Sequence, residues 1–329
     1  MTQRPAARVY RPTSGNIAML ARRLQRGELV AVPTETVYGL AANALDGKAC
    51  RQIFRAKGRP ANDPLIVHIY SLRELAALCV PNAAALALAK NFWPGPLTLV
   101  LPKTDRVPGI VTSGGASVAI RMPQHPVFRR LLKSAGLPLA APSANPFGYI
   151  SPTSAEHVRQ NLGSKIRTIL DGGPSRIGLE STIVDLRDPT SPHLLRPGAI
   201  SAQDIERVLG IRVSVVKTSA STSDKDLVAP GMLRRHYSPR TPVILHDAIE
   251  DVGAANEAYI FMRKPAGRRS GENVFWLDER GRLSGVARRL FATLREVDAQ
   301  RFRRIHVELA AGDPLAEAIN DRLRRAAAR

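Results

Sequence analysis

The chain has 329 residues, of which 44% are hydrophobic and 5% aromatic, and its formal net charge is +20. This length suffices for two domains, and the low aromatic content predicts a mainly aliphatic core. No run approaches the ~20 apolar residues of a membrane span, and the arginines of residues 1–11 precede no apolar signal segment, so we expect a cytoplasmic protein outside the membrane.

The number of cysteines and the distribution of charge narrow the class of protein further. Cys50 and Cys79 are too few for a disulfide framework or a four-cysteine zinc site, and both fall in predicted helices, which indicates buried free thiols. Up to residue 230, Lys and Arg exceed Asp and Glu by 14, against 6 in the rest of the chain. This excess favours polyanionic ligands, namely nucleotides or RNA, although the basic residues are scattered and no RNP-type aromatic motif accompanies them.

Helix and strand patterns alternate over the first two-thirds of the chain. Ile17, Leu20 and Leu24 mark one face of a first helix. Asp46 can cap a second helix that runs to Lys57. Strands are predicted at residues 29–32, 64–69, 97–101, 118–122, 166–170 and 182–186.

Two capping motifs mark further helices, and together the elements define a fold class. Ser71-x-x-Glu74 reads as a capping box, and Thr153-x-x-Glu156 is expected to open another helix. The pattern predicts an α/β fold with a large twisted sheet and flanking helices. Strict alternation of strand and helix fails over residues 95–122, so a mixed sheet is expected.

A second, smaller domain is predicted after a linker. Residues 217–228 are polar without periodicity, and the Pro-, Gly- and Arg-rich stretch that follows could fold over a site as a lid. We divide the chain into a first, larger α/β domain at 1–216, a linker and candidate lid at 217–240, and a small Rossmann-like α/β domain at 241–329. Short strands at 243–245, 259–262 and 305–309 and a helical stripe over 283–297 support the last domain. It has no G-x-G-x-x-G turn, so we assign it no cofactor of its own.

A split pair of motifs carries most of the functional information. Lys57 and Arg59 stand one residue apart before Pro60, and two such cations can grip a polyanion. Ser143 and Asn145 follow a short apolar run and supply neutral hydrogen-bonding groups at a strand end. Taken singly, each motif is more often a solvated pair or a turn. Together they indicate a nucleoside triphosphate site built without a P-loop, and we expect both cations to lack protein partners.

Further motifs support a family resemblance. The run Pro-Thr-Glu-Thr-Val-Tyr-Gly-Leu at 33–40, the split pair, and Glu-Ser-Thr-Ile at 180–183 occur in the order and spacing of the YrdC-domain family. The chain resembles the L-threonylcarbamoyladenylate synthases of that family, in their long two-domain form. The resemblance is strong over roughly residues 10–245 and weaker beyond.

The resemblance implies a reaction and a set of partners. Threonine takes up bicarbonate to give a carbamate, which attacks the α-phosphorus of ATP and releases pyrophosphate. Such an enzyme, a nucleotidyltransferase, would use Mg²⁺ with ATP, although the sequence identifies no metal ligands. Its product, threonylcarbamoyl-AMP, would pass to a threonylcarbamoyl transferase machinery for the t6A modification of tRNA, with tRNA or double-stranded RNA as a candidate partner.

The resemblance also assigns residues to the site. Lys57 and Arg59 would carry catalysis by neutralising charge on the triphosphate. The residues matching nucleotide-binding positions are Lys57, Arg59, Ser117, Ser143, Asn145, Ser151, Arg196 and His236. Those matching threonine-binding positions are Thr36, His68, Arg121, Ala141 and Ser181. Arg121 needs an acidic partner at the end of a buried strand, either the substrate carboxylate or a nearby glutamate.

Two positions depart from the family pattern. Asp63 stands where many relatives have Asn, and a carboxylate there would repel a triphosphate unless it held Mg²⁺ or pointed away. Leu233-Arg234 stands where relatives often have Lys and an aromatic residue, which weakens the assignment of a lid.

Alternative functions fit the sequence less well. The glycine spacing of residues 173–178 is followed by Leu179-Glu180 instead of Lys and Ser/Thr, which excludes a P-loop NTPase. A hydrogenase-maturation carbamoyltransferase would need flanking acylphosphatase and Cys-x-x-Cys segments, which the sequence lacks. The remaining alternative is a non-catalytic protein that binds double-stranded RNA or tRNA through a basic surface.

Overall fold

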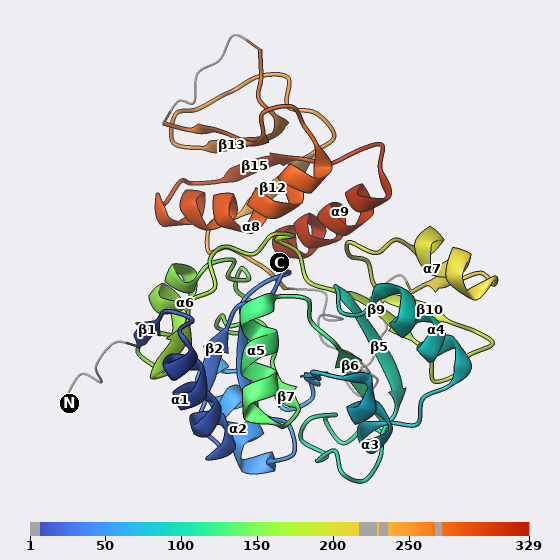
Figure 1. Ribbon diagram of the computed structural model, residues 1–329. Coiled ribbons are helices and arrows are strands. Elements are labelled where there is room, and N and C mark those ends of the chain that lie inside the picture. The colour runs from blue at the N-terminus through green and yellow to red at the C-terminus, as the bar shows by residue number, and fades with distance from the viewer. Residues whose placement is uncertain (1–6, 217–228, 230–235, 267–271, 329) are drawn as a thin grey trace.

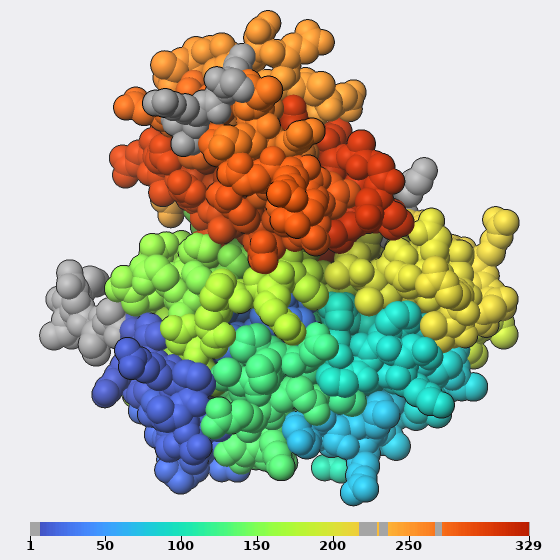
Figure 2. Space-filling view, turned by 45° about the horizontal axis from the view of Figure 1, so that its top comes forward, coloured from blue at the N-terminus to red at the C-terminus, as the bar shows by residue number. Residues whose placement is uncertain are grey.

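The computed structural model describes residues 7–216, 229, 236–266 and 272–328, and these form two units, each built on its own sheet (Figure 1). The space-filling view shows that the second unit, which begins after residue 240, lies on top of the larger first unit (Figure 2). Among the described residues, no helix is long and apolar enough to cross a membrane.

The first unit contains one sheet that is broken into short strands. They are β1 (Arg8–Tyr10), β2 (Val30–Val32), β3 (Gly39–Asn43), β4 (Ile66–His68), β5 (Leu97–Pro102), β6 (Ser117–Arg121), β7 (Leu139–Ala140), β8 (Thr168–Leu170), β9 (Thr182–Asp185), β10 (His193–Arg196) and β11 (Ser214–Val215). Their order is β1-β8-β2-β3-β7-β4-β6-β5-β9-β10-β11. Parallel pairs such as β4 with β6 adjoin antiparallel pairs such as β5 with β6, so the predicted mixed sheet is confirmed.

Helices flank this sheet. They are α1 (Ser14–Gln25), α2 (Gly47–Lys57), α3 (Leu75–Leu78), α4 (Ala83–Phe92), α5 (Pro126–Ala135), α6 (Ala155–Leu162) and α7 (Ala202–Leu209). Asp46 caps α2, and Ser71 with Glu74 forms the predicted capping box at a short 3₁₀ turn. The predicted start of α6 is wrong by one residue, because Ser154 rather than Thr153 accepts the amide hydrogen bond of the first turn.

The core of the first unit is mainly aliphatic, as predicted. One cluster packs α1 and α5 against the sheet through side chains such as Leu20, Leu24 and Phe128. A second cluster on other elements includes Leu40, Ile53, Leu88 and Leu99. Both cysteines are buried and free. Apolar burial of this extent supplies the main free energy that holds the strands in place around the polar site.

The second unit has a parallel four-stranded sheet covered by two helices. Its elements are β12 (Val243–His246), β13 (Ala258–Arg263), β14 (Val274–Asp278), α8 (Leu283–Ala299), β15 (Ile305–Glu308) and α9 (Pro314–Ala327). The strand order is β12-β15-β13-β14. The sequence predicts three of the strands and the buried stripe of α8, but not β14. Helices α8 and α9 lie between this sheet and the first unit (Figure 1).

Candidate active site

A buried pocket opens beside the central strands of the large sheet. Its walls come from the turn between β2 and β3, the segment after α2, strands β4 and β6, the segment after β7, and the segments beside β9 and β10. The lining residues are Thr34, Thr36, Val37, Gly39, Arg59, Ile66, His68, Arg121, Ala141, Pro142, Ser143, Glu180, Ser181, Arg196, His236 and Tyr237.

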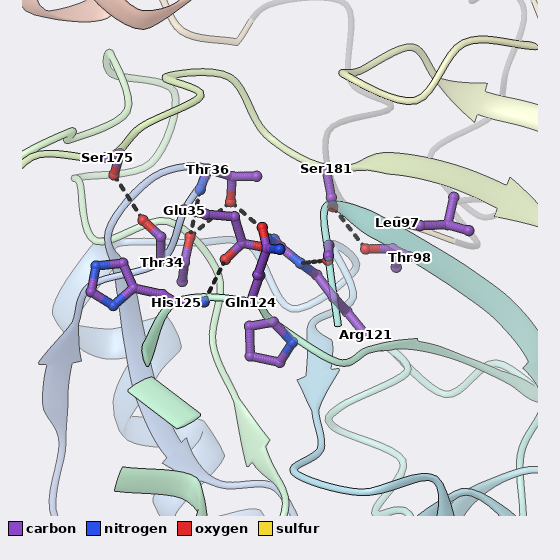
Figure 3. A network of polar contacts seen from close by, with 12 residues as sticks. Thr34, Glu35, Thr36, Leu97, Thr98, Arg121, Gln124, His125, Ser175 and Ser181 are labelled. Carbon is purple, nitrogen blue, oxygen red and sulfur yellow. Dashed lines mark hydrogen bonds and ion pairs between the residues drawn. The ribbon is translucent and has the colours of Figure 1, made fainter. Parts of the chain in front are cut away.

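The turn after β2 is held by its own threonines. Pro33 follows the strand directly, and the amide nitrogens of Thr36 and Val37 each donate to Thr34 Oγ1 at 3.1 Å. Ser175 donates its hydroxyl to the Thr34 carbonyl from a distant loop (Figure 3). These bonds satisfy the polar groups of a buried turn and fix Thr36 on the pocket wall.

Arg121 and Glu35 form a buried ion pair behind the pocket. Arg121 Nη2 lies 2.6 Å from Glu35 Oε1, Nη1 donates to Thr36 Oγ1 at 2.9 Å, and Nε donates to the Gly95 carbonyl (Figure 3). Burial acts to raise the pKa of Glu35, but the charge and hydrogen bond of Arg121 outweigh it and hold that pKa below its usual value. The acidic partner that the sequence requires of Arg121 is therefore supplied, in this structure, by a glutamate.

Lys57 ends α2 and turns inward at Gly58, which adopts the left-handed conformation with φ of 65°. Its Nζ donates to the backbone carbonyls of Ser143 and Asn145, each at 2.5 Å. The expectation that this cation lacks a protein partner is wrong. Burial, with repulsion from Arg59, lowers the pKa of Lys57 well below its ordinary value.

Arg59 is also engaged by the protein. Its Nη2 lies 2.8 Å from Asp63 Oδ1, and it donates to the backbone carbonyls of Asp63 and Pro64. The expectation of a cation free of protein partners is wrong here too. The pair accounts for the departure at Asp63, because its carboxylate is bound to Arg59 and does not line the pocket.

The Ser143–Asn145 segment completes the second half of the split motif. Ser143 lines the pocket and forms an isolated bridge to Gly39 of β3. Asn145 is fully buried, and its side-chain amide donates to the carbonyls of Pro146 and Tyr149. Asn145 therefore shapes the loop rather than lining the pocket.

The wall formed by β9 and β10 joins Ser181 to Arg196. The hydroxyl oxygens of Ser181 and Thr98 lie 2.7 Å apart, and Arg196 donates to Ser181 Oγ at 3.1 Å and to the Ser181 carbonyl at 3.0 Å. All three residues are buried. This network fixes the rotamer of the Ser181 hydroxyl, which faces the pocket across from Thr36 and Arg121 (Figure 3).

Two histidines of the pocket are kept neutral by their surroundings. Burial, assisted by Arg121, lowers the pKa of His68 to about 3. Burial, with the cations Arg59, Lys57, Arg196 and Arg325 nearby, lowers the pKa of His236 well below its ordinary value. Each ring can therefore act as a hydrogen-bonding group but not as a standing cation.

Most predicted site residues meet at this pocket, and some do not. Nine of them line it, namely Thr36, Arg59, His68, Arg121, Ala141, Ser143, Ser181, Arg196 and His236. Lys57 and Ser151 do not line it but contact the lining residues Ser143 and Glu180, and Asn145 contacts Lys57. Ser117 does not line the pocket. It begins β6, whereas the pocket residue Arg121 ends that strand, roughly 13 Å away at ~3.3 Å per residue. The lid positions Leu233, Arg234 and Arg235 lie outside the described residues.

Sequence analysis assigns no role to Glu35, Glu180 or Tyr237. Glu35 lies behind the pocket, paired with Arg121, and the need of Arg121 for a carboxylate is the signal that points to it. Glu180 stands beside Ser181 and is paired with Arg322 of α9, which no local pattern signals. Tyr237 lies in the pocket wall with φ of 62°, a left-handed conformation that sequence patterns do not reveal for a tyrosine.

Known proteins resemble the chain along both units. A family model described as telomere recombination matches residues 22–198, and one described as threonylcarbamoyl-AMP synthase, C-terminal domain, matches residues 200–328. The threonylcarbamoyl-AMP synthase of Pyrococcus abyssi is 44% identical over 94% of this chain and 93% of its own length. The chain belongs to the threonylcarbamoyl-AMP synthase family. The prediction of a threonylcarbamoyl-AMP synthase in its long, two-domain form is confirmed.

Further relatives of the family agree. The Bacillus subtilis threonylcarbamoyl-AMP synthase is 41% identical over 94% of this chain and 92% of its own length. The crystal structure of P. abyssi Sua5 complexed with L-threonine matches with a TM-score of 0.88 and 40% identity, covering 97% of this chain and 96% of that one. The agreement extends over both units, so the predicted fold class is confirmed.

Proposed function

We propose that the pocket makes threonylcarbamoyl-AMP and pyrophosphate from ATP, L-threonine and bicarbonate. The observation that carries this proposal is the convergence, at one buried pocket, of Arg59 and Ser143 with Thr36, Arg121 and Ser181. Cationic, phosphate-compatible groups and hydroxyl groups then line one cavity. The P. abyssi relative solved with L-threonine supports the same reading.

The chemistry divides into two steps. The threonine ammonium first gives up one proton, the resulting neutral amine attacks the bicarbonate carbon, and loss of water leaves a carbamate. A carbamate oxygen then attacks the α-phosphorus of ATP, forming a new P–O bond while the bond to the β-phosphate oxygen breaks and pyrophosphate leaves. Little covalent work falls on the protein, so catalysis rests on positioning and on neutralising charge. A buried pocket also protects the labile carbamate from water.

Lys57 and Arg59 supply the positive charge in this proposal. Arg59 faces the pocket and can offer phosphate the guanidinium edge that Asp63 does not use. Lys57 has three ammonium hydrogens, two of which hold the Ser143–Asn145 loop. Lys57 thus holds this loop in place and contributes positive charge to the site without lining the pocket. Ser143, Arg196 and His236 line the same pocket, and Asn145 and Ser151 contribute without lining it.

In this proposal threonine binds beside Thr36, Ser181 and Arg121. The hydroxyls of Thr36 and Ser181 offer hydrogen bonds, while the small side chain of Ala141 and the neutral ring of His68 border the space for the methyl group. Arg121 is committed to Glu35, Thr36 and Gly95 but retains further N–H groups for a substrate carboxylate.

We propose that Mg²⁺ enters with ATP and is held chiefly by the phosphates. The carboxylates at the pocket are already paired, Glu35 with Arg121, Asp63 with Arg59 and Glu180 with Arg322. Among the described residues, no group of three or more His, Cys, Asp or Glu side chains could hold a metal ion. Mg²⁺ commonly keeps several waters and binds substrate phosphates, which fits this donor set.

The product would serve the t6A modification of tRNA in the cytoplasm, through a threonylcarbamoyl transferase machinery. A charge of +20 is compatible with direct contact to tRNA or double-stranded RNA. A purely RNA-binding role has no use for a buried pocket of this composition, so we rank it second.

Pyrophosphate release tests the proposal. The purified protein should release pyrophosphate from ATP when threonine, bicarbonate and Mg²⁺ are all present, and much less when any one is omitted. Equal release of inorganic phosphate without threonine would contradict a synthase. Salt-sensitive RNA binding without pyrophosphate release would favour the RNA-binding alternative.

A further inference from the structure

Arg322 links the two units of the fold through buried polar contacts. It lies on α9, and it is the largest of the fully buried side chains among the described residues. Its Nε lies 3.1 Å from Glu180 Oε2, and its Nη2 donates to the Glu180 carbonyl at 3.3 Å. Its Nη1 donates to the Pro197 carbonyl at 2.6 Å. The guanidinium therefore reaches two segments of the first unit at once.

Both segments adjoin pocket residues. Ser181 follows Glu180 directly, and Arg196 directly precedes Pro197. Arg196 in turn donates to Ser181 Oγ at 3.1 Å. Because a guanidinium presents its N–H groups in a rigid plane, one side chain sets the separation and angle of the two segments that carry this contact.

The same wall is held from a second helix at its other end. Ser151 Oγ donates to Glu180 Oε1 at 2.5 Å. Arg295 of α8 donates to the carbonyls of Ile150 and Ser151. Arg295 thus fastens the units together and reaches Glu180 only through Ser151, whereas Arg322 contacts Glu180 and Pro197 directly.

We propose that Arg322 is a positioning residue of the synthase site. It holds Ser181 and Arg196 in the arrangement that threonine requires, so the second unit takes part in building the threonine pocket. An arginine that served only to attach the units could use partners anywhere in the interface, whereas the partners of Arg322 in the first unit are the chain neighbours of two pocket residues. The proposal rests on the role proposed above for Ser181.

Steady-state kinetics with full-length variants test the proposed positioning role of Arg322. Arg322→Gln should raise the KM for threonine about 10-fold to 10²-fold at saturating ATP, with a smaller change in kcat, because a misplaced binding group is costly. Arg322→Lys should recover part of the loss, since an ammonium can still pair with Glu180 but cannot also span to Pro197.

Folding must be separated from positioning. Arg322→Gln leaves Glu180 buried without its cation, which destabilises the protein. The double variant Arg322→Gln with Glu180→Gln removes both charges and should melt closer to wild type, yet still show the raised threonine KM. Arg324→Ala, at an exposed position on the same helix, is the matched control and should leave the KM unchanged.

Three outcomes decide the matter. Folded Arg322 variants with the wild-type threonine KM would overturn the proposal. An equal rise in threonine KM for Arg295→Ala would also overturn it, because it would show general loosening of the interface. A wild-type protein without threonine-dependent pyrophosphate release would instead contradict the proposed function, so the two failures are distinguishable.

Discussion

The ammonium of Lys57 lies 2.5 Å from the backbone carbonyl oxygen of Asn145, so the two halves of the split motif touch directly. The contact joins the end of α2 to the loop after β7 across 88 residues of chain. Lys57 is buried, and the loop depends on it for a hydrogen-bond donor. A substitution at this position must therefore change both the charge of the site and the loop that Ser143 occupies.

Replacing Lys57 should harm both activity and stability. We expect Lys57→Ala to lower the rate of pyrophosphate release by about 10²-fold or more, as loss of a positioned charge typically does. It should also lower the free energy of unfolding by about 1–3 kcal/mol, because buried carbonyls lose their donor. Lys48→Ala, at an exposed position on the same helix, is the control. Near-wild-type turnover at saturating ATP would refute the assignment.

The Arg59–Asp63 pair separates stability from catalysis. Arg59→Ala leaves a buried carboxylate without its cation and should destabilise the fold by about 3–5 kcal/mol. Adding Asp63→Ala should restore much of that loss in urea unfolding, while pyrophosphate release stays about 10²-fold or more below wild type. Recovery of activity together with stability would show that Arg59 acts on Asp63 alone and not on ATP.

The sequence predicts the local chemistry of this site better than its long-range pairings. Asp46 at the start of α2 and the mixed character of the sheet follow from patterns within a few residues. The carbonyl groups that Lys57 binds lie 86 and 88 residues away along the chain, and the glutamate that pairs with Arg121 lies 86 residues away. Only the order of strands in the sheet brings these partners together. The fold decides which cations face a ligand and which face the protein.

Selection among amino acid substrates should depend on the hydroxyl groups that line the pocket. Serine lacks one methyl group, which is worth only ~1–3 kcal/mol, so we expect slow but measurable use of serine. Valine lacks the hydroxyl, and a site built to bond it should reject valine more strongly, since buried groups such as Ser181 Oγ would lose a partner. Comparison of kcat/KM for threonine, serine and valine checks this, and equal use of threonine and valine would contradict a polar clamp.

The buried histidines should make stability depend on pH in the acidic range. The pKa of His68 is lowered to about 3 by burial, against ~6.5 in an unfolded chain. Between these values the unfolded state binds a proton that the folded state does not. The free energy of unfolding therefore rises with pH across this window. The contribution of His68 is lost as the pH falls from 6.5 towards 3, by up to ~1.4 kcal/mol per pH unit.

Substitution of His68 should flatten that dependence. We expect His68→Gln to reduce the slope of unfolding free energy against pH by up to one proton between pH 3 and 6.5, measured by urea unfolding at several pH values. His157→Gln is the matched comparison, because burial lowers the pKa of His157 to about 4 at a site on α6 that does not line the pocket. Its effect should be confined to the window from about 4 to 6.5. Both variants should flatten the slope, but His68→Gln alone should raise the threonine KM, because its ring borders the pocket. An unchanged slope in His68→Gln would mean that this ring takes up its proton in the folded state at the same pH as in the unfolded chain.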